Sequence, residues 1–217
     1  MPPKVKYTKE EIIAAALDLA RERGMDAVAA REVGKRLGTS SSPIFTVWSS
    51  MEQLQEEVRS AAWNEFQGYL KVADRFNPAF KMRGMQMVRF AKDEPMLFRM
   101  LFMNGSSTVS FDEMMQTRIT GFESDVRAIA ESYGVPTEKA EHLFRQLWIH
   151  AYGICTLCAM KVCDFSEQEI AGLLGEVFAG MVMVTKSGAA FTGVMPAPKE
   201  SEAGKRLAGN IPHVEKG

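Results

Sequence analysis

Four residues between positions 150 and 163 carry side chains that could bind a metal ion or react covalently: His150, Cys155, Cys158 and Cys163. All four fall on one predicted helix. A zinc site usually gathers its ligands from two segments of the chain, and free cysteine is among the most buried residue types. We therefore expect Cys155 and Cys158 to pack in the core, with no metal or cofactor. A redox- or metal-responsive role for this pair is the alternative.

A second set of residues has the chemistry to contact double-stranded DNA. Short hydroxyl side chains can hydrogen-bond to base edges or phosphates, apolar side chains can pack on a thymine methyl, and basic side chains can neutralise phosphates. This set, which lies near the N-terminus, consists of Lys4, Lys6, Lys9, Arg31, Thr39, Ser40, Ser41, Ser42, Pro43, Phe45, Thr46 and Trp48.

The composition limits the classes of function. The 217 residues are 46% hydrophobic and 24% charged with a net charge of −1, so DNA binding would need a local basic patch. There is no apolar run of membrane-spanning length and no apolar signal core, which predicts a cytoplasmic protein with no membrane partner. Three cysteines cannot form a closed disulfide set. Without a glycine-rich phosphate loop, HExxH or GxSxG motif, we do not expect an enzyme.

The N-terminal residues must be positioned by short helices. Thr8 and Glu11 form a predicted capping box, and Gly24 supplies a left-handed stop for the first helix. A second helix is expected over residues 27–37. Gly38 then precedes a third helix at about 40–48, and a long fourth helix follows.

Residues 8–54 resemble the N-terminal domain of the TetR family of bacterial transcriptional regulators. The matching elements are the helix over 12–24, Arg31-Glu32-Val33 with Lys35-Arg36, Gly38, and Phe45-x-x-Trp48 before a Ser-x-Glu-x-Leu run. The resemblance implies a helix-turn-helix domain whose third helix enters the major groove. It also implies a variable C-terminal domain that binds a small ligand and forms a homodimer.

The sequence departs from the family pattern in three ways. Phe45 stands where members often have tyrosine, and Met51 stands where they often have lysine. The third helix has no Arg, Lys, Asn or Gln, so it cannot read guanine or adenine by a bidentate contact. We expect DNA binding that depends more on DNA shape. The alternative is a ligand- or partner-binding dimer whose DNA-binding domain has decayed.

The remaining sequence predicts an all-α fold of about nine helices. The expected later helices include a single long one over 110–133, another over 137–163, and a last one from the Ser166–Glu169 capping box to about residue 186. The predicted domains are 1–49 for DNA binding, 50–187 for ligand binding and dimerisation, and 188–217 as a flexible tail.

Methionine and aromatic residues are concentrated in the middle of the chain. Methionine is flexible and polarizable, so a wall built from it can adapt to varied apolar ligands. With the family resemblance, this predicts a pocket for a small apolar effector; ordinary core packing is the alternative. The candidate lining residues are Met85, Gln86, Phe90, Met100, Met103, Met115, Phe122, Gln146, Trp148 and Tyr152.

The last predicted helix contains a stripe of small residues: Ala171, Gly172, Gly175, Ala179 and Gly180. Glycine inside a helix costs about 1 kcal/mol relative to alanine, so several of them indicate close backbone approach. The resemblance implies that the last two helices pair with those of a second subunit. Packing of the stripe within one chain is the alternative.

Together these features predict a ligand-responsive transcriptional regulator, most simply a repressor. Two-fold symmetry would place two recognition helices about one DNA turn apart on a palindromic operator. A small apolar effector would then release the protein from DNA.

Overall fold

Helices make up nearly all of the described part of the chain. The computed structural model describes residues 7–103 and 110–188, and within these ranges it contains ten α-helices, two short 3-10 helices and no strand. The α-helices are α1 Lys9–Arg23, α2 Ala30–Arg36, α3 Ser42–Val47, α4 Met51–Val72, α5 Phe80–Asp93, α6 Pro95–Phe102, α7 Phe111–Arg118, α8 Phe122–Tyr133, α9 Thr137–Ala159 and α10 Glu167–Ser187. The all-α prediction is confirmed. The tail predicted at 188–217 lies, apart from its first residue, outside the described residues.

Both predicted capping boxes are present. The Thr8 side chain accepts from the Glu11 backbone N–H, and the Glu11 carboxylate accepts from the Thr8 backbone N–H. Ser166 and Glu169 make the same reciprocal pair at the start of α10. Each pair satisfies backbone donors that the first turn of a helix leaves free.

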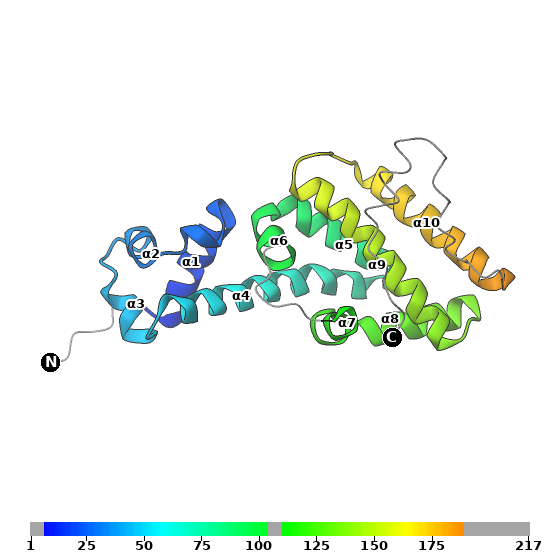
Figure 1. Cartoon of the computed structure of the whole chain (residues 1–217), viewed down its shortest axis with the longest axis horizontal. Coiled ribbons are helices and arrows are strands. Elements are labelled where there is room, and N and C mark those ends of the chain that lie inside the picture. Colours follow the sequence, from blue (N-terminus) through cyan, green and yellow to red (C-terminus); the bar gives the residue numbers. More distant parts are fainter. Residues whose placement is uncertain (1–6, 104–109, 189–217) are drawn as a thin grey trace, which may run out of the picture.

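Helix α4 connects the two ends of the molecule (Figure 1). α1, α2 and α3 pack together around its first turns, and its later turns run beneath α5 and α9. Its buried residues recur every four positions, namely Leu54, Val58, Ala62, Phe66 and Leu70. Because this single stripe faces first α1 and then α5, a displacement of α4 would be felt at both ends.

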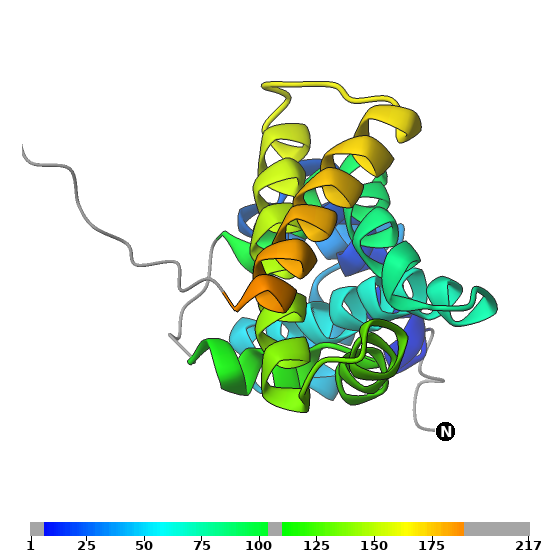
Figure 2. The same ribbon diagram turned by 90° about the vertical axis from the view of Figure 1, so that its right-hand side faces the viewer.

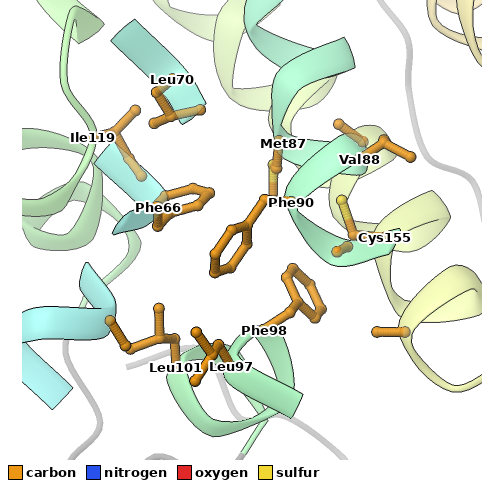
Figure 3. Close-up of a cluster of buried hydrophobic side chains, with 14 of the residues drawn as sticks. Phe66, Leu70, Met87, Val88, Phe90, Leu97, Phe98, Leu101, Ile119 and Cys155 are labelled. Atoms are coloured by element: carbon orange, nitrogen blue, oxygen red, sulfur yellow. The ribbon is translucent and has the colours of Figure 1, made fainter. Parts of the chain in front are cut away.

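The C-terminal half is built around α5 and α9, with α8 and α10 against α9 (Figures 1 and 2). A cluster of aromatic and aliphatic side chains from α4, α5, α6 and α9 forms its core, in which Phe66, Phe90 and Phe98 are fully buried (Figure 3). The Phe66 and Phe90 rings meet edge to face at 5.2 Å between centroids.

Several predicted boundaries are wrong. The second helix begins at Ala30 rather than near residue 27, because residues 25–27 form a 3-10 turn. The third spans only Ser42–Val47, and α9 ends at Ala159 instead of 163.

The single long helix predicted over 110–133 is two helices, α7 and α8. The break falls at Gly121, whose φ of 84° lies in the left-handed region. A Cβ at Gly121 would come within 2.6 Å of the guanidinium carbon of Arg83. The chain therefore bends where a side chain from another helix occupies the space beside it, and this raises the number of helices from about nine to ten.

Candidate functional site

The three N-terminal helices share a small core that fixes the position of α3. Ile44 on the inner side of α3 is completely buried, as are Ile12 of α1 and Val33 of α2. Trp48, at the end of α3, is only 5% exposed and therefore packs in this core. The prediction that Trp48 contacts DNA directly is therefore wrong, because its ring packs in the core beneath α3.

Gly34 sets the distance between α2 and α3. A Cβ at this position would lie 2.7 Å from the Ser40 carbonyl oxygen and 2.8 Å from its carbonyl carbon. Real Cβ atoms do not approach backbone that closely, so only glycine lets the turn pass so near α2. The role of this residue was not predicted from the sequence; its only signal was a glycine inside a predicted helix, four residues before Gly38.

The outer surface of α3 carries short polar side chains and two exposed apolar side chains, Phe45 and Val47. Phe45 is 52% exposed, and Ser42 and Thr46 are exposed beside it. The Thr46 hydroxyl donates to the Pro43 carbonyl at 2.6 Å, so its oxygen can still accept a hydrogen bond. Of the remaining predicted contacts, Ser40 is exposed, whereas Thr39, Ser41 and Pro43 are half-buried. The exposed side of α3 therefore presents hydroxyl and apolar side chains and no basic side chain.

Positive charge beside α3 comes from α2. Arg31 and Lys35 lie one turn apart, both exposed, and neither makes an ion pair with any described residue. Lys9, by contrast, is paired with Glu57 at 2.5 Å. Lys4 and Lys6 lie outside the described residues. Lys35 is thus a second free cation that the predicted contact set did not include.

A salt-bridge cluster joins α1 to α4 and α6. The Arg21 guanidinium donates to Glu65 of α4 at 2.6 Å and to Glu94, the N-cap residue of α6, at 2.9 Å. Close by, a Cβ on Gly24 would lie 3.1 Å from the terminal methyl of Met96. The end of α1 is therefore in contact with both helices that enter the C-terminal half.

The residues predicted to line an effector pocket do not come together around one cavity. Phe90 and Met115 are completely buried, and Gln86, Met100, Phe122 and Trp148 are nearly so. Tyr152 is half-buried and donates to the Phe102 carbonyl at 3.0 Å. Met103 and Gln146 are exposed, so their placement at a core pocket was wrong: Met103 is the C-cap residue of α6, and Gln146 lies on the outer side of α9.

An apolar hollow lies instead between α5 and α10. It has a volume of about 710 Å³, within the usual range for small-molecule sites. Met85 is the one predicted pocket residue that lines it. The other lining residues are Phe80, Lys81, Met82, Gly84, Tyr133, Leu147, Ala171, Leu174, Gly175, Phe178, Ala179, Val182, Met183 and Lys186. We call this hollow the α5–α10 groove.

The predicted dimer stripe on α10 is exposed and is not packed within the chain. The buried face of α10 consists of Ile170, Leu174, Phe178 and Val182. Ala171, Gly175 and Ala179 line the α5–α10 groove, whereas Gly172 and Gly180 do not. The alternative of close packing within one subunit is therefore wrong, since a Cβ added at Gly172, Gly175 or Gly180 would meet no atom within 4 Å.

A second set of exposed apolar side chains, which shares Met183 with the groove, lies on α9, on the turn that follows it and on α10. Of the eleven large hydrophobic side chains exposed among the described residues, seven lie between positions 149 and 184. They are Ile149, Leu157, Met160, Val162, Leu173, Met183 and Val184. We call this set the α9–α10 face. By length and composition α10 is also apolar enough to cross a membrane, although the same test is passed by helices that pack against protein.

Cys155 and Cys158 lie in surroundings that disfavour the reactive thiolate. Cys155 is fully buried in the core (Figure 3), and this burial raises the pKa of its thiol well above the ordinary value. Burial likewise raises the pKa of Cys158. The buried Nε2 of His150 has no hydrogen-bond partner among the described residues. Within those residues no three His, Cys, Asp or Glu side chains form a metal-binding group.

A buried ion pair ties α4, α5 and α8 together. Arg83 of α5 is 2% exposed and donates two hydrogen bonds to Asp125 of α8, which is 1% exposed. It also donates to the Leu70 carbonyl of α4 at 3.1 Å and to Asp74 at 2.9 Å. Burial raises the pKa of Asp125, while the bonds from Arg83 act in the opposite direction.

Comparison with known proteins agrees with this arrangement. Residues 12–58 match the family described as "Bacterial regulatory proteins, tetR family", and residues 82–182 match the "Tetracyclin repressor-like, C-terminal domain". No curated protein sequence matches significantly. A solved structure of a TetR variant from Acinetobacter baumannii AYE in complex with minocycline has the same fold, with a TM-score of 0.53 and 17% identity. The similarity covers 87% of this chain and 100% of that one.

The two matched ranges together cover more than half of the chain, and the first of them contains most of the α1–α3 unit. They follow the order seen in the structure, a helix-turn-helix unit and then a helical ligand-binding domain. The chain belongs to the TetR family of bacterial regulatory proteins.

Proposed function

We propose that the protein is a cytoplasmic, ligand-responsive repressor that binds a palindromic operator as a homodimer and leaves it when a small effector binds. The observation that carries this proposal is the outer surface of α3, exposed beside the free cations Arg31 and Lys35 and held by a buried core. The minocycline complex of the similar TetR structure supports a small-molecule effector. Residues 1–49 would form the DNA-binding domain and 50–187 the effector and dimer domain.

DNA recognition would combine phosphate contacts with the shape of the major groove. Arg31 and Lys35 would neutralise phosphates, while Ser42 and Thr46 would hydrogen-bond to base edges or the backbone. Phe45 would pack on a thymine methyl or a sugar. Because short hydroxyls discriminate bases less sharply than arginine or asparagine, much of the specificity would come from DNA shape and deformability.

Selection of bound duplexes from a random library should enrich a palindrome with half-sites about one helical turn apart. On the enriched duplex, Arg31→Gln should reduce the slope of log K against log salt by about 0.9 for each phosphate that the variant no longer neutralises. Arg127→Gln on α8, an exposed arginine outside any ion pair with the described residues, is the matched control and should leave the slope unchanged. Failure to enrich any sequence at low salt would contradict the proposal and favour a decayed DNA-binding domain.

The α9–α10 face is the surface we assign to the dimer. Its exposed aliphatic and methionine side chains would be covered by the same face of a second subunit, as a two-fold interface requires. The apolar character of α10 then has a partner in protein rather than in lipid.

Ile149→Glu combined with Leu157→Glu should convert the dimer into a monomer, since both carboxylates would be buried without partners in the interface. Sedimentation velocity measures the change, and operator affinity should fall at least tenfold because two half-sites can no longer be bound together. Phe76→Glu, at an exposed phenylalanine before α5, is the control. An unchanged sedimentation coefficient in the double variant would refute this interface.

Signal transmission would pass through the contacts of α1 with α4 and α6. Binding in the C-terminal domain would shift α4, and the Arg21 bridges to Glu65 and Glu94 would carry the shift into the α1–α3 unit. The protein would exchange between a DNA-binding state and a released state. An effector shifts this equilibrium only by the difference between its binding free energies for the two states, typically about 1–3 kcal/mol.

A further inference from the structure

The α5–α10 groove has two unlike ends. α5 and α10 are antiparallel: Phe80 packs on Phe178 with ring centroids 5.5 Å apart, while Arg89, further along α5, pairs with Glu167 at the start of α10. The first turn of α5 therefore lies beside the middle of α10, and Lys186 lies about two helical turns beyond Phe178, towards the end of α10. Ala171 marks the opposite end, about four helical turns from Lys186.

The half of the groove between the first turn of α5 and the last turn of α10 is cationic. Lys81 and Lys186 both line it, together with Tyr133, whose ring lies 5.5 Å from Phe178. No acidic residue among those described lines the groove. Within the described part of the chain, neither ammonium group takes part in an ion pair and the Tyr133 hydroxyl has no hydrogen-bond partner.

At the other end of the contact between α5 and α10, the basic side chains are paired with carboxylates. There Arg89 is paired with Glu167, and Lys92 is paired with Asp164 at 2.8 Å. The cations at the apolar groove are thus the ones left without a carboxylate from the described residues. Between the two ends the lining is aliphatic, aromatic and methionine-rich.

A site with one cationic end and a long apolar body is complementary to an amphiphile with an anionic head. From this geometry we infer that the groove binds a long-chain carboxylate, with its head between Lys81, Lys186 and Tyr133 and its chain along Leu174 and Phe178. The inference rests on the proposed function in one respect only, namely that this ligand is the effector. Met82, Met85 and Met183 would adapt to chains of different length.

The first test compares two probes of equal length, dodecanoate and dodecan-1-ol, by isothermal titration calorimetry on the full chain below the micelle concentration. Dodecanoate should bind at least fivefold more tightly, because only its head can pair with the lysines. Equal affinities for the acid and the alcohol would overturn the inference.

Variants then locate the head and the chain. Lys81→Met and Lys186→Met should each weaken dodecanoate about two- to fivefold and leave dodecanol unchanged, which is the range of a solvent-exposed ion pair. Lys139→Met, at an exposed lysine of α9 outside the groove, is the control. If the double lysine variant keeps the acid-to-alcohol ratio of the wild type, the assigned head site is wrong.

Gly175→Phe should block both probes. A Cβ at Gly175 meets no atom within 4 Å, so the new ring can enter the groove without disturbing the fold. Gly68→Phe on exposed α4 surface is the matched control. Sedimentation velocity should show the same mass for both variants. If Gly175→Phe binds dodecanoate normally, or becomes monomeric, the groove belongs to another occupant and the inference fails.

Operator binding measured on the same samples separates this inference from the proposed function. Lysine-dependent dodecanoate binding that leaves operator affinity unchanged would support the groove assignment and refute its role as the effector site. Conversely, an operator complex that is released by another compound, with no dodecanoate bound, would refute the groove assignment and leave the proposed function intact.

Discussion

Asp125→Ala should lower the free energy of unfolding by about 3–5 kcal/mol, the usual cost of leaving one member of a buried ion pair without its partner. Arg83 would remain 2% exposed between α4, α5 and α8 with its main acceptor removed. The Leu70 carbonyl and Asp74 satisfy only part of the guanidinium. Chemical denaturation monitored by circular dichroism measures the loss directly.

Two controls make this result specific to the buried pair. Asp74→Ala removes a carboxylate that is 54% exposed and contacts the same guanidinium, and its cost should stay below about 1 kcal/mol. Replacing both partners, as Arg83→Met with Asp125→Leu, should recover most of the lost stability, since no unpaired charge remains. An Asp125→Ala protein as stable as Asp74→Ala would show that the pair does not hold these helices together.

Gly34→Ala should loosen the helix-turn-helix unit and reduce operator binding. The added methyl would overlap the Ser40 backbone, so α3 must shift away from α2. Overpacking of this kind typically costs about 1–3 kcal/mol. Because the shifted element is the one proposed to enter the major groove, operator affinity measured by fluorescence anisotropy should fall at least tenfold.

The same substitution at Gly68 is the matched control and should act in the opposite direction. Gly68 lies on the exposed side of α4, and a Cβ there meets nothing within 4 Å. Replacing an exposed helical glycine by alanine should stabilise the protein by about 0.5–1 kcal/mol without affecting DNA. Equal effects of Gly34→Ala and Gly68→Ala would refute the close approach of α2 and α3.

The parts of the fold set by local chemistry could be predicted from the sequence. The capping boxes at Thr8 and Ser166 depend only on residues three positions apart, and both are present. The break between α7 and α8 could not be predicted in this way. The break lies beside Arg83, which is 38 positions from Gly121 in the sequence and reaches it only in the folded chain.

The same distinction applies to the candidate site. The polar surface of α3 follows from a short run of residues, whereas burial of Trp48 and pairing of Lys9 with Glu57 depend on how α1 and α4 pack against that run. The methionine content indicated adaptable apolar surface but not its location. The groove forms where α10 packs against α5, and no local sequence pattern encodes that packing.

The Arg21 cluster has a consequence for building hybrid sensors from this protein. In such a hybrid, this protein is the recipient, and another regulator donates the part that replaces residues 1–50. Arg21 is then lost, while Glu65 and Glu94 remain. A donor lacking a basic residue at the end of its first helix would leave two carboxylates of the recipient facing each other across the joint. Under the proposed signal transmission through Arg21, such a hybrid should recognise the donor's operator but respond weakly to the effector, and restoring one arginine should recover the response.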